Sequence, residues 1–179
     1  PGMSLSNLPS NARLGCLLFD LDGTLIDSSG DLTGTVNRLL AKLGYPLLDP
    51  VKVLSFVGEG VRVFITRSLT ASTGKAPTDE ALSDAVNQFE DLYAQHMLDE
   101  TRLYPNVAEM LIGLRGIPKA VVTNKARNFS VGILEALGIA SEFAEVVGGD
   151  CPDGRKPSPA PLFYALRHLI GRASCRERV

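Results

Sequence analysis

Short apolar runs that end in polar residues occur at three places in the chain. The run at 16–19 stops at Asp20, the run at 118–122 stops at Thr123, and the run at 143–147 stops at a Gly-Gly-Asp sequence. Runs of this length with polar boundaries are typical of strands buried in a parallel sheet. The pattern therefore predicts three such strands.

Helical spacing marks the segments next to these strands. Residues 106–115 and 127–138 repeat apolar positions every three or four residues, and a further helix is expected at 159–169. Gly138 stands where a helix commonly stops. Strands that alternate with helices of this length predict an α/β fold, in which a Rossmann-like parallel sheet has right-handed crossovers.

The stretch 31–99 breaks the alternation, because it carries helical patterns with no strand between them. Helices are expected at about 31–43, 50–56, 59–71 and 78–99. An all-helical block after the first strand predicts an inserted helical cap subdomain. The expected organisation is a core of 14–27 and 104–170, a cap of 28–103, an N-terminal segment of 1–13 and a tail of 171–179.

Composition narrows the possible functions. The chain has 179 residues, with 45% hydrophobic and 21% charged residues, as in a globular domain with a small insertion. The net charge of -2 argues against nucleic acid as a partner. The chain contains no run of about 18 apolar residues, so no membrane span is predicted. Its first residues also lack the apolar pattern of a leader peptide. Three widely spaced cysteines predict no disulfide framework, so the cytoplasm is the expected location.

Polar side chains follow the predicted strands where candidate chemistry would lie. Asp20 and Asp22 come directly after the first strand, Thr123 and Asn124 follow the second, and Lys156 precedes the last helix. Ligands bind beyond the carboxyl ends of strands in open parallel sheets. Carboxylates, a hydroxyl, an amide and a lysine on successive loops predict a phosphate site.

The order and type of these residues resemble the haloacid dehalogenase-like phosphatases. Asp20-Leu21-Asp22-Gly23-Thr24 resembles the first motif of that family, Thr123-Asn124 its second and Lys156 its third. The helical insertion resembles the family's cap. The sequence Thr123-Asn124-Lys125 and the hinge at Tyr104-Pro105 are most similar to those of phosphoglycolate phosphatases, and the resemblance covers about 14–170.

The resemblance implies a role for each motif residue. Asp20 would attack phosphorus to form an aspartyl-phosphate, and Asp22 would act as general acid and then as base. Mg²⁺ would be bound by Asp20 and the backbone carbonyl of Asp22, while Lys156 adds positive charge. The phosphate-binding residues would be Gly23, Thr123 and Asn124.

Within the predicted cap, the loop before the third helix is the candidate for substrate recognition. Gly58 and Gly60 permit close backbone approach, and Glu59 lies between them. Arg62 has the guanidinium geometry that pairs with a substrate carboxylate. The alternative interpretation is a helix-start loop with a solvated arginine.

Other polar residues near the motifs are given supporting roles. We expect Asp150 to cap a loop and His96 to lie on the surface of the last cap helix. Lys125, Arg127 and Asp27 are expected to be solvated groups or to support the site from outside it.

The resemblance also implies a fourth motif, which is a further strand followed by acidic magnesium ligands. Residues 172–179 offer only Glu177 and no strand pattern. We therefore expect a C-terminally truncated chain in which the last strands of the sheet are missing and 171–179 is a non-native tail. Weak metal affinity and an unpaired sheet edge would follow.

The leading hypothesis is a magnesium-dependent phosphatase that hydrolyses a small phosphorylated metabolite similar to 2-phosphoglycolate, as a monomer or homodimer. Three alternatives remain open: another small-phosphate hydrolase, a sugar phosphomutase of the same fold, and a catalytically inactive fragment.

Overall fold

A parallel sheet lies at the centre of the core. The structure is a computed structural model that describes residues 15–176. The three strands β1 (Leu17–Phe19), β4 (Lys119–Val122) and β5 (Glu145–Val147) lie in the order β1-β4-β5. Leu17 pairs with Lys119, and Ala120 pairs with Glu145. All three carboxyl ends therefore open toward the same edge.

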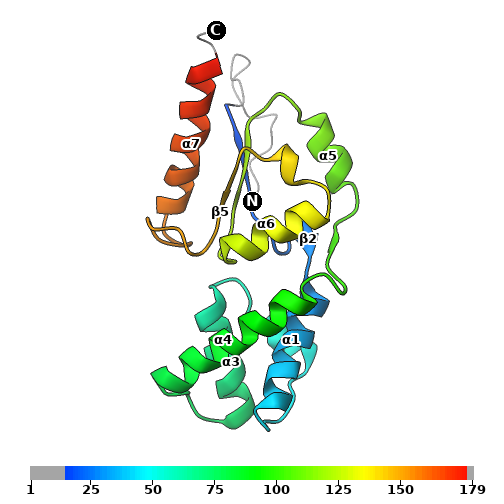
Figure 1. The fold of residues 1–179 in the computed structure, drawn as a ribbon, viewed down its shortest axis with the longest axis vertical. Coiled ribbons are helices and arrows are strands. Elements are labelled where there is room, and N and C mark those ends of the chain that lie inside the picture. The colour runs from blue at the N-terminus through cyan, green and yellow to red at the C-terminus, as the bar shows by residue number, and fades with distance from the viewer. Residues whose placement is uncertain (1–14, 177–179) are drawn as a thin grey trace.

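Helices cover both faces of this sheet (Figure 1). The helix α7 (Ala160–Arg176) lies on one face, and α5 (Val107–Gly113) and α6 (Arg127–Ala136) lie on the other. The alternation along β4 explains this layering, because Ala120 and Val122 pack with α7 while Val121 packs with α5 and α6.

The cap is a four-helix unit with its own hydrophobic core. It contains α1 (Ser29–Lys42), α2 (Pro50–Leu54), α3 (Val61–Thr73) and α4 (Asp79–His96). Side chains at the ends of two helices fix where they begin. Asp49 accepts hydrogen bonds from the backbone N–H groups of α2, and Thr78 accepts one from α4.

A two-stranded antiparallel ribbon joins the cap to the core. Its strands are β2 (Ile26–Asp27) and β3 (Arg102–Leu103). The buried carboxylate of Asp31 accepts hydrogen bonds from the backbone N–H groups of Glu100 and Thr101, both at 2.9 Å. The chain therefore leaves and re-enters the core at adjacent positions. Sequence patterning did not reveal these two strands, because two-residue strands have no periodicity to detect.

The predicted α/β fold is confirmed, with one difference at the C-terminal end. The strands and cap helices occur where the pattern placed them, with small shifts at their ends. The last helix, expected to end at 169, continues as α7 to Arg176, so it includes most of the predicted tail. Gly171 does not end it, since one glycine costs a helix only about 1 kcal/mol. The predicted N-terminal segment 1–13 and the last three residues lie outside the described residues.

Among the helices of residues 15–176, none combines the length and apolar character needed to cross a bilayer.

Candidate active site

A cavity of about 210 Å³ lies between the carboxyl ends of the strands and the cap. Its core side contains most of the polar residues singled out from the sequence. The residues that form this side are Asp20, Asp22, Thr123, Asn124, Lys125 and Lys156. The cap side is largely apolar and includes Val57, Val61, Phe64 and Phe89, with Glu90 as its acidic member. The core side of the cavity, called its floor below, is thus polar, and the cap side, called its roof, is largely apolar.

Asp20 is held at the cavity floor by two contacts. The Nζ atom of Lys156 lies 2.8 Å from Asp20 Oδ2, and the backbone N–H of Leu21 donates to Oδ1 at 2.8 Å. Lys156 also donates to the carbonyl oxygen of Val122 at 3.0 Å. Because Asp20 directly follows β1 and Val122 ends β4, the parallel sheet itself brings these groups together. The Asp20 side chain remains 44% exposed, so it is accessible from the cavity.

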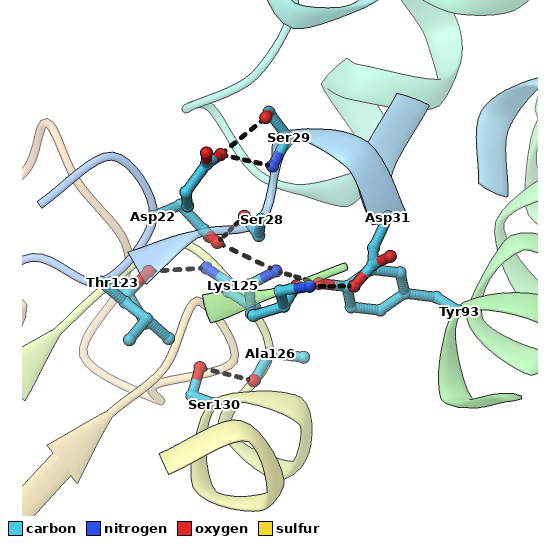
Figure 2. A network of polar contacts seen from close by, with 12 residues as sticks. Asp22, Ser28, Ser29, Asp31, Tyr93, Thr123, Lys125, Ala126 and Ser130 are labelled. Atoms are coloured by element: carbon cyan, nitrogen blue, oxygen red, sulfur yellow. Dashed lines mark hydrogen bonds and ion pairs between the residues drawn. The ribbon is translucent and has the colours of Figure 1, made fainter. Parts of the chain in front are cut away.

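Asp22 is held by a different set of partners (Figure 2). Ser28 Oγ donates to Asp22 Oδ1 at 2.6 Å, and Lys125 Nζ lies 3.2 Å from the same oxygen. Lys125 also donates to the hydroxyl oxygen of Tyr93 at 2.7 Å. The Lys125 side chain is only 7% exposed, so this ammonium group is buried among polar partners.

Burial and charge set the protonation of this group of residues. Burial opposes the charged form of Lys125, but Asp22 and then Tyr93 outweigh it, so the pKa of Lys125 is raised. Burial also raises the pKa of Tyr93, although Lys125 opposes this. Both directions favour an ammonium group beside a neutral phenol at neutral pH.

Thr123 and Asn124 both line the cavity, but their side chains differ in whether they have a proton left to donate to a ligand. Thr123 Oγ1 accepts a hydrogen bond from the Lys125 backbone at 3.2 Å, which leaves its hydroxyl proton for a ligand. Asn124 Nδ2 donates to the carbonyl oxygens of Gly58 at 2.7 Å and Lys156 at 3.0 Å. Both amide protons are therefore used, so the backbone N–H of Asn124 is the better donor for a phosphoryl oxygen.

Gly23 has a structural role in the loop after β1. Its φ angle of 76° favours glycine, and its N–H donates to the carbonyl oxygen of Ile26 at 2.9 Å. Gly23 is not among the residues that line the cavity. In this structure Gly23 shapes the turn that carries Asp22, and its role in phosphate binding stays a prediction.

The four predicted cap residues divide into two groups. Gly58 and Gly60 line the cavity, whereas Glu59 and Arg62 do not. Glu59 pairs with Arg67 at 2.7 Å, and the Arg62 guanidinium donates to Ser83 Oγ at 3.3 Å, both on the exposed surface. In this structure Glu59 and Arg62 lie outside the cavity, which favours the solvated-arginine alternative for Arg62, and the role of both in substrate recognition stays a prediction.

The residues expected to support the site from outside differ in where they lie. Asp150 accepts a hydrogen bond from the Arg127 backbone at 2.9 Å, as expected for a loop cap. Asp27 binds Ser29 and pairs with Arg102, and the hydrogen bonds from Ser29 lower its pKa. Lys125 lines the cavity and contacts Asp22, so of its two expected roles the structure favours a supporting one over a solvated one.

Sequence reasoning missed two residues of this network, Ser28 and Tyr93, and gave Lys125 only a supporting or solvated role. Lys125 directly follows Thr123-Asn124, and this adjacency to the second motif was the available signal. Tyr93 had no such signal, because an aromatic residue at helical spacing on α4 is indistinguishable from a core residue.

The oxygen atoms at the floor are suitable for a hard divalent ion. Mg²⁺ retains several waters and commonly takes only one or two carboxylates from the protein. The family resemblance assigns this role to the Asp20 carboxylate and the Asp22 backbone carbonyl, and both residues line the cavity. Within residues 15–176, no three acidic, histidine or cysteine side chains gather as a metal site. A carboxylate with a carbonyl oxygen would suit a magnesium ion that takes its remaining ligands from water and substrate.

Comparison with known proteins identifies close relatives of the chain. The profile of the family described as haloacid dehalogenase-like hydrolase matches residues 17–174. Phosphoglycolate phosphatase of Colwellia psychrerythraea is 41% identical over 157 residues, which cover 86% of this chain and 70% of that protein. The enzyme of the same name from Nitrosococcus oceani is 39% identical over 155 residues, covering 86% and 69%.

A solved structure shares the same architecture. The crystal structure of a predicted phosphoglycolate phosphatase from Haemophilus somnus matches with a TM-score of 0.83 and 34% identity, covering 90% of this chain and 73% of that one. Both the sequence profile and the fold lead to the same assignment. The chain belongs to the haloacid dehalogenase-like hydrolase family.

Proposed function

We propose that this chain hydrolyses small phosphomonoesters, with Asp20 as the nucleophile and 2-phosphoglycolate as its leading candidate substrate. The observation that carries the proposal is the placement of Asp20. Its carboxylate is fixed by Lys156 and the Leu21 N–H, stays accessible, and shares one cavity with Thr123 and Asn124. Attack on phosphorus would form an aspartyl-phosphate and release the alcohol.

Electrostatic repulsion is the main obstacle to this attack. Two like unit charges at ~4 Å repel by about 4 kcal/mol at an effective dielectric constant of 20. Lys156, 2.8 Å from Asp20, offsets part of this repulsion. A magnesium ion bound by Asp20 and the Asp22 carbonyl oxygen would supply further positive charge. The Thr123 hydroxyl and the Asn124 backbone N–H would donate to the phosphoryl oxygens, where charge spreads in the transition state.

Asp22 is the proposed proton carrier. Its Oδ1 atom is engaged by Ser28 and Lys125, and among residues 15–176 the structure shows no hydrogen bond or ion pair to Oδ2. Oδ2 would protonate the leaving alkoxide and later take a proton from the water that attacks the aspartyl-phosphate. Over the full cycle, the P–O bond to the alcohol breaks, an oxygen atom from water takes the place of the alcohol oxygen on phosphorus, and Asp20 is regenerated.

Two observations support a small anionic leaving group. The curated relatives are phosphoglycolate phosphatases, and the N-terminus of α3 borders the cavity through Gly60 and Val61. The first backbone N–H groups of a helix and its dipole favour an anion such as a carboxylate. The closed cap would also keep bulk water from the phosphorylated aspartate.

The test is hydrolysis of p-nitrophenyl phosphate by the wild type and Asp20→Asn, each with and without Mg²⁺. We expect activity only for the wild type with Mg²⁺, and a phosphate adduct on Asp20 detected by mass spectrometry. Asp84→Asn is the matched control, because Asp84 is exposed on α4 and does not line the cavity. Equal rates in all four conditions would eliminate the proposal, and a panel that includes 2-phosphoglycolate then addresses the substrate.

A further inference from the structure

Two carboxylate–lysine pairs lie on the cavity floor, and they differ in what holds each lysine. Lys156 contacts Asp20 and the carbonyl oxygen of Val122, so its partners all belong to the core. Lys125 contacts Asp22 in the core and the Tyr93 hydroxyl of the cap helix α4. Only the second pair therefore depends on where the cap lies.

Tyr93 is well suited to transmit the position of the cap. The residue is 1% exposed, and its ring stacks on Phe89 of the same helix with ring centroids 5.6 Å apart. The ring of Phe129, on the core helix α6, forms a T-shaped pair with it, with ring centroids 5.3 Å apart. The hydroxyl thus sits on a ring that cannot turn without disturbing the aromatic packing, and it reaches Lys125 across the boundary between cap and core (Figure 2).

We propose that Tyr93 and Lys125 are positioning residues through which closure of the cap fixes the side chain of Asp22. This proposal rests on the function proposed above. With the cap closed, Lys125 and Ser28 both hold Oδ1 of Asp22 and turn Oδ2 toward the substrate. When the cap moves away, Lys125 loses the Tyr93 oxygen and becomes hydrated, since a buried ammonium group requires polar partners. Only Ser28 then orients Asp22.

The proposal separates the two chemical roles on the floor. Asp20 keeps its contact with Lys156 whether the cap is open or closed, so the orientation of the nucleophile does not depend on the cap. Asp22 is aligned only when the cavity is shut. Proton transfer to a leaving alkoxide would therefore depend on the Tyr93 hydroxyl, whereas attack on a phosphate ester whose leaving group needs no proton would not.

The decisive variant is Tyr93→Phe, which keeps the ring and removes the hydroxyl. Tyr45→Phe is the matched control, because Tyr45 is a 41% exposed cap residue that does not line the cavity. The value of kcat/KM is measured for 2-phosphoglycolate, whose alkoxide needs a proton, and for p-nitrophenyl phosphate, whose phenolate does not. Because general acid catalysis contributes about 10²–10⁴-fold, we expect at least a tenfold loss for 2-phosphoglycolate and less than a twofold loss for p-nitrophenyl phosphate.

Lys125→Met should also lower kcat/KM for 2-phosphoglycolate by at least tenfold. Equal losses for both substrates in Tyr93→Phe would overturn the proposal, since they would indicate general damage to the site. An unchanged kcat/KM for 2-phosphoglycolate would also overturn it.

A second measurement needs neither metal nor substrate. Amide hydrogen exchange of the loop 123–126 is followed by mass spectrometry in the metal-free protein. Tyr93→Phe should accelerate exchange of this loop, where the Lys125 N–H is bonded to Thr123 Oγ1, and Tyr45→Phe should not. Unchanged exchange in Tyr93→Phe would contradict the coupling. If the wild type hydrolyses neither ester, the proposed function fails, while the exchange result still decides the coupling.

Discussion

The side-chain amide of Asn124 donates a 2.7 Å hydrogen bond to the backbone carbonyl of Gly58, so a residue at the phosphate site also ties the cap to the core. Its other amide proton goes to the carbonyl oxygen of Lys156. Asn124 therefore holds three segments together: the loop after β4, the cap loop before α3 and the loop that carries the lysine.

This arrangement predicts that Asn124→Ala destabilises the protein. The variant removes the donor to the carbonyl groups of Gly58 and Lys156, and a typical hydrogen bond contributes about 0.5–1.5 kcal/mol. We expect a lower free energy of unfolding in urea denaturation. Asn128→Ala, at an exposed position on α6, is the control and should change stability by less than about 0.5 kcal/mol. Equal stability of the two variants would count against the bridging role.

A second prediction concerns Gly149, which follows β5. A β-carbon at this position would overlap the backbone carbonyl of Asn124. Overpacking against backbone costs about 1–3 kcal/mol, so Gly149→Ala should lower the melting temperature. Gly113→Ala is a suitable comparison, because a β-carbon there meets no atom within 4 Å. A Gly149 variant as stable as the Gly113 variant would show that the loop can move aside.

The position of Arg62 yields a prediction opposite to the one from sequence. The guanidinium binds Ser83 on the outer side of the cap, away from the cavity. Arg62→Ala should therefore leave KM for 2-phosphoglycolate within about twofold of the wild type, since exposed polar contacts contribute little. Gly60→Ala serves as the contrast, because Gly60 lines the cavity and its φ angle of 89° is strained for any side chain. A large rise in KM for Arg62→Ala would restore its role in recognition.

Glu90 gives a pH-dependent prediction. Burial raises its pKa above the ordinary 4.5, and the neighbouring Asp91 and Asp150 add to the effect. A raised carboxyl pKa means that the folded state binds the proton more tightly than the unfolded state. Glu90 then favours folding below pH 4.5, and this contribution is lost as the pH rises through the folded-state pKa.

Glu90→Gln should accordingly melt at a higher temperature than the wild type at pH 7, and the difference should shrink toward pH 4. Thermal unfolding monitored by circular dichroism at both pH values provides the measurement. Glu80→Gln, at an exposed site in the first turn of α4, controls for a general change in charge. An advantage that is the same at both pH values would exclude this mechanism.

The strands and the main site residues were predictable from sequence for one physical reason. Parallel strands end at one edge, so the polar residues after each buried run, Asp20 and Thr123, had to meet. Lys156 was predictable from its place before a helix in the same order of motifs. These inferences depend on local patterns that the topology then brings together.

The remaining parts of the site depend on contacts that no local pattern encodes. Tyr93 and Lys125 are 32 residues apart in sequence, and only the packing of α4 over the core brings them together. The position of Arg62 outside the cavity has a similar origin. Successive residues of a helix point about 100° apart, so when Val61 and Phe64 face the cavity, Arg62 faces elsewhere.

The ribbon formed by β2 and β3 places side by side the two points where the chain passes between core and cap. Ile26 lies opposite Leu103, and Asp27 lies opposite Arg102. A tight turn from Asp27 to Arg102 would therefore complete a hairpin and leave the sheet beneath it with unchanged connections. The whole cap is therefore an insertion at a single point of the core. A replacement cap would leave the strand connections intact, but it would have to supply new partners for Lys125 and Asn124 in place of Tyr93 and Gly58.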